Sequence, residues 1–253
     1  MFWSPEMILL LAKPAFLEKL DADIYLNFIK EARWKYLTDG LWVTLKVTFF
    51  AVLIGIALGF LVAIIRTAHD KVGTVPVLTK IILEVLNFIC NLYLTIIRGT
   101  PVVVQLLIIY FVIFGSVRID KVFVAIIAFG INSGAYVAEI VRGGIMSIDK
   151  GQFEAGRSLG FNYTQTMWYI IVPQTFKNVL PALGNEFIVL LKETSVAGYI
   201  ALQDLTKGGD IIRSQTFSAY LPLLSVAAIY LIMVIILSNL QKLLERKMRS
   251  SEK

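Results

Sequence analysis

A cluster of polar side chains follows Pro181 in an otherwise apolar part of the sequence. Helical spacing places Asn185 and Lys192 on one face, with Glu186 and Glu193 on the neighbouring face. Charged groups inside a membrane segment are costly and usually functional, and such a face could bind the charged backbone of an amino acid. The alternative is a structural ion pair, for instance between Lys192 and Glu186. The candidates are Asn185, Glu186, Lys192, Glu193, Thr194 and Ser195, together with Gln105, a lone polar residue that could face a partner helix or a solute pathway.

Enzymatic chemistry has little support in this sequence. His69 is the only histidine and Cys90 the only cysteine. This excludes an intrachain disulfide and argues against a zinc site or a His-based catalytic triad. No Gly-x4-Gly-Lys-Ser/Thr phosphate loop is present, and "TKGGD" (Thr206 to Asp210), whose lysine precedes the glycines, is predicted to be an external turn. We therefore expect a chain that is not an enzyme and holds no cofactor or metal.

One pair of opposite charges has the spacing of a helical ion pair. Glu139 and Arg142 lie three residues apart, near the end of an apolar segment. Residues at this spacing are neighbours on a helix surface. The sequence therefore predicts that these two residues pair with each other in a purely structural role.

A polar stretch punctuated by glycine, residues 149–173, separates two apolar runs, and we call it the elbow. Asp149 and Gln152 have the spacing of a helix N-cap and its reciprocal partner. Gly160 has the position of a left-handed residue that ends a helix. These signals predict a short helix over about 150–159.

A second short helix is predicted after this glycine. Asn162 and Gln165 repeat the capping pattern, and Pro173 is expected to stop the helix. Helices of this length need tertiary support to be stable. The elbow is therefore expected to be a pair of short helices around a glycine turn.

The first helix of the elbow carries two small residues, Ala155 and Gly156, on one face. Glu154 and Arg157 flank that face with opposite charges. Such a face would let another backbone approach closely, whereas the alternative is a capped loop that only joins two membrane spans. Because a glycine inside a helix costs about 1 kcal/mol relative to alanine, the composition favours a docking surface.

Composition predicts an all-α integral membrane protein. Of the 253 residues, 57% are hydrophobic and 17% charged, and the mean hydropathy is +0.75. Every fourth residue from Ala51 to Ala63 is alanine or glycine, which could form a smooth packing face, although glycine is common in membrane helices in general. Apolar runs predict about five transmembrane helices, over residues 41–65, 102–114, 122–141, 179–200 and 220–240.

The segment from Ile81 to Ile97 is not counted among these spans. Its polar residues recur at spacings of three and four, which suits an interfacial helix or one packed against partner helices better than a span surrounded by lipid. Counting it as a sixth span would reverse the orientation of the N-terminus. The stripe consists of Glu84, Asn87, Asn91, Thr95 and Arg98.

Basic residues indicate the orientation. The tail after the last apolar run is rich in lysine and arginine, which places the C-terminus in the cytoplasm. With five spans, the elbow is then also cytoplasmic and the N-terminus lies outside. This pattern accounts for the formal charge of +6 without nucleic acid. The expected regions are an extracytoplasmic or interfacial lead-in over 1–35, a transmembrane domain over 36–245 and a basic cytoplasmic tail over 246–253.

The sequence "EAGRSLGFNYTQTMWYIIVP" (Glu154 to Pro173) resembles the EAA loop of ABC importer permeases. That pattern is Glu-Ala-Ala, three residues, Gly, nine residues, then Ile-x-Leu-Pro. The chain keeps the glycine as Gly160 and has Ile170 at the isoleucine position. It has Gly156 instead of the second alanine and Val172 instead of leucine.

Three further stretches are similar to the polar amino-acid uptake branch of these permeases, which includes the histidine, glutamine and arginine types. They are "IRGTPVVVQLLIIYF", "SGAYVAEIVRGGIMSIDKGQFEAGRSLG" and "LPALGNEFIVLLKETSVAGYI". The motifs occur in the family order. The resemblance runs from about Tyr36 to Glu245.

The resemblance implies a mechanism and a set of partners. The elbow would be the coupling helix that docks on a cytoplasmic dimer of ABC ATPase subunits, which bind ATP and Mg²⁺. A second permease copy or a related permease, an extracytoplasmic solute-binding protein and a polar amino acid would complete the importer in a bacterial-type cell membrane. The alternative is a scaffold or signalling subunit that docks an ATPase without moving solute. The implied docking residues are Glu154, Ala155, Gly156, Arg157, Ser158, Gly160 and Phe161.

Overall fold

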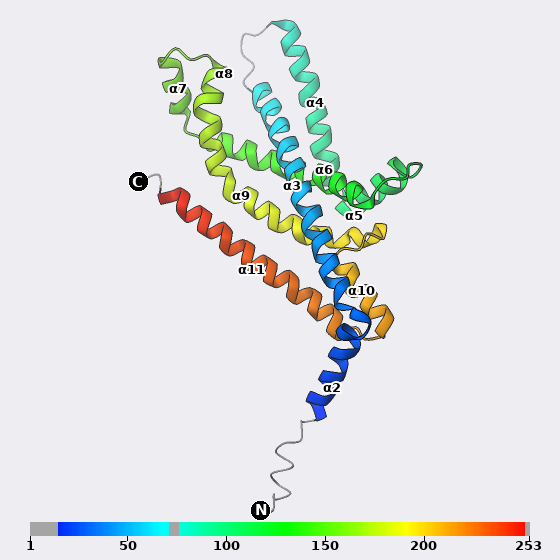
Figure 1. Cartoon of the computed structure of the whole chain (residues 1–253). Coiled ribbons are helices and arrows are strands. Elements are labelled where there is room, and N and C mark those ends of the chain that lie inside the picture. Colours follow the sequence, from blue (N-terminus) through cyan, green and yellow to red (C-terminus); the bar gives the residue numbers. More distant parts are fainter. Residues whose placement is uncertain (1–14, 71–75, 251–253) are drawn as a thin grey trace, which may run out of the picture.

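The computed structural model describes residues 15–70 and 76–250. Over these residues the chain is helical and contains no β-strand, so the all-α prediction is confirmed (Figure 1). The elements are α2 (Ala15–Ile24), η1 (Tyr25–Ile29), η2 (Lys30–Ala32), α3 (Trp34–Asp70), α4 (Val77–Gly99), α5 (Val102–Leu107), η3 (Ile108–Ile113), α6 (Lys121–Met146), α7 (Lys150–Ser158), α8 (Tyr163–Thr166), η4 (Met167–Ile171), α9 (Val172–Glu193), η5 (Thr194–Ile200), α10 (Leu205–Thr216) and α11 (Tyr220–Ser250).

Among the described residues, four helices are long and apolar enough to cross a membrane: α3, α4, α6 and α11. The prediction of repeated membrane-spanning helices is therefore confirmed. The predicted apolar stretch over 179–200 forms the second half of α9 followed by η5, and α9 is not among these four helices. The number of spans and their orientation stay predictions.

Two predicted segments differ in length from the expectation. The stretch from Ile81 to Ile97, expected to be interfacial or packed against partner helices, lies within α4, a helix of 23 residues that is long enough to span. The predicted span over 102–114 forms only a short apolar helical segment, Val102–Ile113. Twelve residues at 1.5 Å each rise about 18 Å, which is less than the ~30 Å of a bilayer core. Because α4 packs on α3 and α6, its polar stripe need not face lipid.

The packing of α3 against α6 depends on glycine. A Cβ atom on Gly55 would lie 2.8 Å from Oγ of Ser133, and one on Gly59 would lie 2.5 Å from Cγ1 of Val137. The four stripe residues Ala51, Gly55, Gly59 and Ala63 are buried. The packing-face interpretation of this stripe is therefore correct, and α3 contacts α6 almost backbone to backbone.

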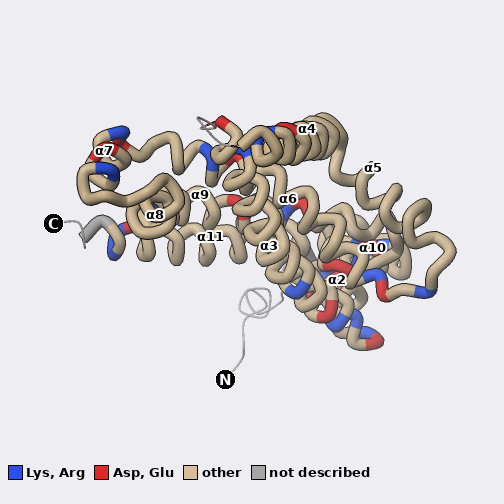
Figure 2. The backbone as a smooth tube through the Cα atoms, turned by 90° about the horizontal axis from the view of Figure 1, so that it is seen from above, with Lys and Arg blue, Asp and Glu red and all other residues tan. Residues whose placement is uncertain are grey.

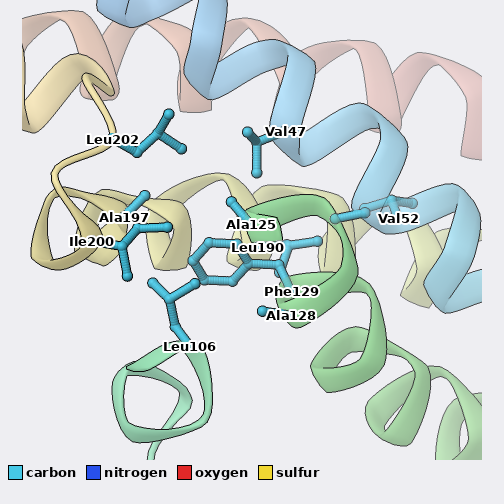
Figure 3. Packing of buried hydrophobic residues seen from close by; sticks show 11 residues of the cluster. Val47, Val52, Leu106, Ala125, Ala128, Phe129, Leu190, Ala197, Ile200 and Leu202 are labelled. Atoms are coloured by element: carbon cyan, nitrogen blue, oxygen red, sulfur yellow. The ribbon is translucent and has the colours of Figure 1, made fainter. Parts of the chain in front are cut away.

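The core lies where α6 meets the surrounding helices. Phe129 of α6 is fully buried, and Val47, Leu106 and Leu190 converge on it from α3, α5 and α9 (Figure 3). Ile200 of η5 closes the same cluster. Because α6 is central, polar side chains from several neighbouring helices can contact it.

The "TKGGD" stretch is not the external turn that the sequence predicts. It lies in α10, which begins after the N-cap Asp204, and both of its glycines are buried. A Cβ atom on Gly208 would collide with the carbonyl oxygen of Tyr36. A Cβ atom on Gly209 would collide with the side chain of Val226 in α11, so the two glycines let α10 pack closely on α3 and on α11.

Charged residues gather in particular parts of the molecule. Figure 2 shows them around α7 and around α2 and α10, whereas α11 carries few along most of its length. The described part of the predicted lead-in, residues 15–35, contacts the transmembrane domain, because buried Arg33 donates to the carbonyl oxygen of Leu26 at 2.7 Å and to Gln215 of α10 at 3.2 Å. The predicted basic tail continues α11 as helix as far as Ser250.

Candidate functional sites: an exposed elbow and a buried polar network

The first helix of the elbow, α7, begins at the predicted N-cap. The side chain of Asp149 accepts a hydrogen bond from the backbone N–H of Gly151 at 2.6 Å. Gln152 does not reciprocate as expected, because its Oε1 accepts from Nε2 of Gln174 at 3.2 Å. Gln152 therefore ties α7 to α9 instead of closing a capping box.

The predicted glycine turn ends α7. Gly160 has a φ of +80°, a conformation that costs other residues because of their Cβ atom. The backbone N–H of Phe161 donates to the carbonyl of Gly156 at 3.0 Å, and that of Gly160 donates to the carbonyl of Arg157 at 2.9 Å. This pair of bonds is a Schellman motif, so the turn is held by backbone hydrogen bonds as well as by its glycine.

The second half of the elbow begins as predicted and ends differently. Asn162 and Gln165 form a complete capping box with both hydrogen bonds at 2.9 Å. Pro173, however, does not stop the helix. It lies in the first turn of α9, which follows the π-helical η4 and continues to Glu193. The proline lies where the π-helical bonding of η4 changes to the α-helical bonding of α9, and the helix continues through it, so the elbow leads directly into a long bundle helix.

Most of the predicted docking residues form one exposed surface. Gly156 is the exception, because it is buried and a Cβ atom there would lie 2.7 Å from the Thr166 side chain. The expectation that Gly156 shares the exposed face is therefore wrong. Its role is to let α7 pack on α8, which explains why a glycine replaces the family's alanine. The exposed residues are Glu154, Ala155, Arg157, Ser158 and Gly160, with Phe161 half-buried.

Aromatic packing supports the elbow from within. The rings of Phe153 and Tyr163 stack with centroids 6.3 Å apart and an interplanar angle of 8°. Burial, with the negative charge of Asp70 adding to it, raises the pKa of the Tyr163 hydroxyl above its ordinary value. The phenol is therefore neutral at physiological pH and acts as a packing group between α7 and α8.

A buried polar network joins α6 to α5 and α9. The hydroxyl of Ser133 donates to Oε1 of Glu186 at 2.8 Å. Its chain neighbour Asn132 donates to Oε1 of Gln105 at 3.0 Å. All four side chains are buried. Because buried polar groups in a membrane domain must find partners within the protein, these bonds fix α5 and α9 to the same turn of α6.

Gln105 also braces the break between α4 and α5. Its Nε2 donates to the carbonyl oxygens of Ile97 at 2.7 Å and Thr100 at 3.0 Å. These carbonyls lie at the end of α4, where no later helical N–H is available to them. Gln105 therefore contacts another part of the protein and stabilises the chain where α4 ends.

The structure does not bring the other pathway candidates into this network. Asn185 and Lys192 are exposed, and Glu193 and Ser195 are half-buried. Buried Thr194, the first residue of η5, donates to the carbonyl of Leu191 at the end of α9 at 2.8 Å. In the described part of the chain, no ion pair joins Lys192 to Glu186, so the structural pair considered from sequence is absent there.

Two members of the network, Asn132 and Ser133, were not singled out from the sequence. They are consecutive polar residues within the apolar run over 122–141. That isolation is a usable signal, since polar side chains inside a span usually face the protein interior. The sequence does not indicate their partners, because Gln105 and Glu186 lie on other helices.

The predicted pairing of Glu139 with Arg142 is wrong. Oε1 of Glu139 lies 3.0 Å from Nη1 of Arg66 and 3.5 Å from Nη1 of Arg98. Arg142 instead pairs with Asp70 at 2.9 Å. The neighbouring helices α3 and α4 run beside α6 and supply closer partners than its own next turn does.

The geometry does not suggest a metal centre. Among the described residues, no three His, Cys, Asp or Glu side chains lie close enough together to hold an ion. The exposed elbow lies at one end of the molecule (Figure 1), and the buried polar network lies within the bundle. These two features suit a membrane protein in which a partner protein that binds the exposed elbow acts on the interior of the helix bundle.

The sequence profile of the binding-protein-dependent transport system inner membrane components matches residues 82–250. The chain belongs to this family. The permease resemblance noted in the sequence is thereby confirmed.

Known relatives of this permease have been named for amino-acid transport. The glutamine transport system permease protein GlnP of Escherichia coli (strain K12) is 36% identical over 216 residues, covering 84% of the chain and 93% of the relative. The arginine transport system permease protein ArtQ of Bacillus subtilis (strain 168) is 35% identical over 219 residues, covering 86% and 94%. The two matches extend over nearly the whole length of both relatives.

Solved structures agree with the fold. A chain from the crystal structure of an amino acid ABC transporter with histidines superposes with a TM-score of 0.75 at 40% identity, covering 87% of this chain and 98% of that chain. A chain of the MetNI methionine ABC transporter superposes with a TM-score of 0.70 at 18% identity, over 84% and 96%. The second likeness supports the permease fold alone.

Proposed function

We propose that this chain is the membrane-spanning subunit of an ATP-driven importer for a polar amino acid. Family membership supplies the transport role. Relatives named for glutamine and arginine transport support an amino acid as the substrate class. The chain itself is not an enzyme in this proposal, since ATP and Mg²⁺ bind to a separate pair of ABC ATPase subunits.

The exposed face of the elbow is the observation that supports a role in coupling ATP hydrolysis to transport. The Schellman turn at Gly160 and the capping box at Asn162 hold this face in one conformation, and the hydrogen bond between Gln152 and Gln174 ties it to α9. Because the elbow continues into α9, a displacement of α7 by a docked ATPase reaches the bundle through a helix rather than a loose loop. The proposed docking residues are Glu154, Ala155, Arg157, Ser158, Gly160 and Phe161, with Gly156 supporting them from inside.

Three further partners belong to the proposal. An extracytoplasmic binding protein delivers the solute, as the family description implies. A second permease, either another copy or a related chain, completes the path across a bacterial inner membrane. Within this chain, Gln105 and Glu186 position the helices that line the path. We assign Asn185, Lys192, Glu193 and Ser195 to the surface of the same path, whereas Thr194 is buried and is not assigned to it.

Reconstitution tests the proposal. The chain is co-expressed with its ATPase, inserted into vesicles and supplied with ATP, a binding protein and labelled L-glutamine or L-arginine. We expect the amino acid to accumulate and to stimulate ATP hydrolysis. The variant Ala155→Trp should reduce ATPase co-purification, whereas Ala219→Trp, at an exposed alanine before α11 at the other end of the molecule, should not.

The outcomes separate transport from the alternative role. If ATPase binding is normal but no amino acid moves, the chain is a scaffold or signalling subunit and the transport proposal fails. If Ala155→Trp co-purifies with the ATPase as well as Ala219→Trp does, the elbow is not the docking surface.

A further inference from the structure

An apolar groove lies between α3, α9 and α11. Figure 1 shows α11 diverging from α3 as it runs towards the C-terminus, and the groove beside it has a volume of about 560 Å³. Buried side chains, such as Val52 and Leu183, form its floor. Exposed side chains, such as Phe49, Phe176 and Leu244, form its rims. The groove is therefore a concave site on the side of the helix bundle, of a size usual for a small-molecule ligand.

The polar side chains that line the groove are satisfied within the protein. Nε2 of Gln241 donates to the carbonyl oxygen of Pro181 at 2.9 Å and to Oε1 of Glu245 at 3.0 Å. Gln241 also packs on Gly184, where a Cβ atom would lie 3.2 Å from its Cγ. All other lining side chains are apolar. Because a polar solute would lose its hydrogen bonds to water on such a surface, the lining suits a hydrocarbon chain instead.

The length of the groove matches one leaflet of a bilayer. On α11 its lining residues run from Leu237 to Met248, which corresponds to a rise of about 16 Å. On α9 they run from Phe176 to Ile188, a rise of about 18 Å. Half of the ~30 Å hydrocarbon core is about 15 Å. Because Phe176 lies in the second turn of α9, directly after the elbow, the groove occupies the leaflet on the elbow side.

Basic side chains surround the elbow end of this groove. Lys177 of α9 lies three and four residues before the lining residues Leu180 and Pro181, so it shares their face. On α11, Lys242 and Arg246 each directly follow one of the two polar lining residues. All three cations are exposed, and across residues 15–70 and 76–250 no ion pair engages any of them. Long basic side chains at helix ends reach the headgroup region of a bilayer, so the groove has a positive rim at that level.

This positive rim does not suit a second copy of the chain. Two copies in one membrane have the same orientation, and a symmetric contact places the same surface patch against itself. The cations at the rim would then face their own counterparts, and like charges in an interface are costly. Basic pockets between membrane helices on the cytoplasmic side instead suit anionic lipid headgroups. Because a lipid tail gains little by leaving other lipid tails for an apolar groove, the headgroup must supply the selectivity.

We propose that this groove binds one anionic phospholipid. An acyl chain lies along α9 and α11, and Lys177, Lys242 and Arg246 hold the phosphate. The bound lipid fills the space between α11 and α3 and braces α9, the helix into which the elbow leads. This inference goes beyond the proposed function and rests on it only for placing the elbow end of the molecule in the cytoplasmic leaflet.

Lipid titration tests the proposal. The full-length chain is purified in detergent and titrated with phosphatidylglycerol, or with phosphatidylcholine of the same acyl chains, and native mass spectrometry counts the bound lipid. Each basic residue near an anionic headgroup contributes about fivefold in affinity. The wild type should therefore bind one phosphatidylglycerol per chain about 100-fold more tightly than phosphatidylcholine. The triple variant Lys177→Gln, Lys242→Gln, Arg246→Gln should bind the two lipids equally weakly.

A second triple variant controls for the loss of charge itself. Lys30→Gln, Lys35→Gln, Arg118→Gln removes the same number of exposed cations, from the segments before α3 and before α6. It should keep the wild-type preference for phosphatidylglycerol. Since all six substituted residues are exposed, both triple variants should fold, and their melting temperatures without added lipid should match that of the wild type.

A bulky substitution tests the groove separately from its rim. Leu180→Trp places an indole in the groove and should abolish binding of phosphatidylglycerol at this site. Val85→Trp, at an exposed position on α4, is the control and should bind as the wild type does. Because a ligand that binds only the folded state raises the melting temperature, phosphatidylglycerol should stabilise the wild type and Val85→Trp but not Leu180→Trp.

Four results would overturn the proposal. The wild type could bind both lipids equally, the triple variant at the rim could keep the preference, or Leu180→Trp could retain the lipid. The fourth is a Leu180→Trp protein that changes from paired to single chains in the mass spectrum, which would make the groove a contact between copies. Uptake of amino acid by reconstituted wild type is scored separately, and its absence would refute the proposed function without changing the lipid result.

Discussion

The elbow and the buried polar network are both held by hydrogen bonds, but those bonds differ in how far they reach along the chain. In the elbow, the bonds of the capping box join residues three apart, and the turn bond from Phe161 reaches back only to Gly156. In the network, Asn132 binds a residue 27 positions away and Ser133 one 53 positions away. The elbow is thus fixed by its own sequence, and the network by the packing of three helices.

This difference predicts two separable kinds of damage. Substitutions in the network should destabilise the bundle and impair transport, while leaving the surface offered to the ATPase intact. Substitutions in the elbow should weaken ATPase binding, with little change in the melting of the bundle. The four predictions below test this division.

Glu186→Ala should have the largest effect. It removes a buried side chain, leaves a cavity and deprives the Ser133 hydroxyl of its acceptor. Cavity formation and an unpaired buried donor together cost about 2 to 4 kcal/mol. Thermal unfolding of the purified permease in detergent should show the largest drop in melting temperature of this series.

Glu186→Gln is the matched control, because it keeps the shape and an acceptor oxygen for Ser133. Its melting temperature and its uptake of amino acid should stay close to those of the wild type. A normal melting temperature with abolished uptake would instead mean that Glu186 contacts the solute directly.

Gly55→Ala should have the next largest effect. The new methyl group would lie 2.8 Å from Oγ of Ser133, so α3 must move away from α6 or Ser133 must leave Glu186. Overpacking of this kind costs about 1 to 3 kcal/mol. Gly143→Ala is the control, since a Cβ atom there meets nothing within 4 Å. Equal melting temperatures for the two variants would contradict the close contact of α3 with α6.

Local signals made the elbow largely predictable from the sequence. The N-cap Asp149, the turn at Gly160 and the capping box at Asn162 each depend on residues within a few positions, and all three are present in the structure. The end of the second helix was not predictable in the same way. Pro173 was expected to end the helix. Instead it lies at the start of α9, directly after the π-helical η4, and the sequence alone does not indicate that π-helical turn.

Long-range contacts made the interior unpredictable. The polar stripe on α4 correctly indicated contact with partner helices, but not that Arg98 would meet Glu139. The spacing of three residues predicted that Glu139 pairs with Arg142. That prediction was wrong, because other helices supply closer partners for both residues. Gly156 shows the same limit within the elbow, since only the fold reveals that it faces Thr166.

Gly160→Ala should weaken ATPase binding without destabilising the bundle. Alanine at a φ of +80° is strained, and the left-handed conformation costs about 1 to 2 kcal/mol. If that strain loosens the elbow, affinity for the ATPase should fall by about 5- to 30-fold, measured by titrating the detached ATPase onto immobilised permease. Gly143→Ala, in a helix and free of strain, should bind normally. A melting temperature that falls as far as that of Gly55→Ala would show that the elbow is not independent of the bundle.

Asn162→Ala should have the smallest effect of the four. It removes the side chain that accepts from the backbone of Gln165 at 2.9 Å, and loss of an N-cap costs about 1 kcal/mol. ATPase affinity should therefore fall by up to about fivefold, with an unchanged melting temperature. Asn162→Asp keeps the acceptor and should bind like the wild type. If Asn162→Ala also binds like the wild type while Gly160→Ala does not, the ATPase contacts α7 and its turn alone, and α8 serves only to carry the displacement into α9.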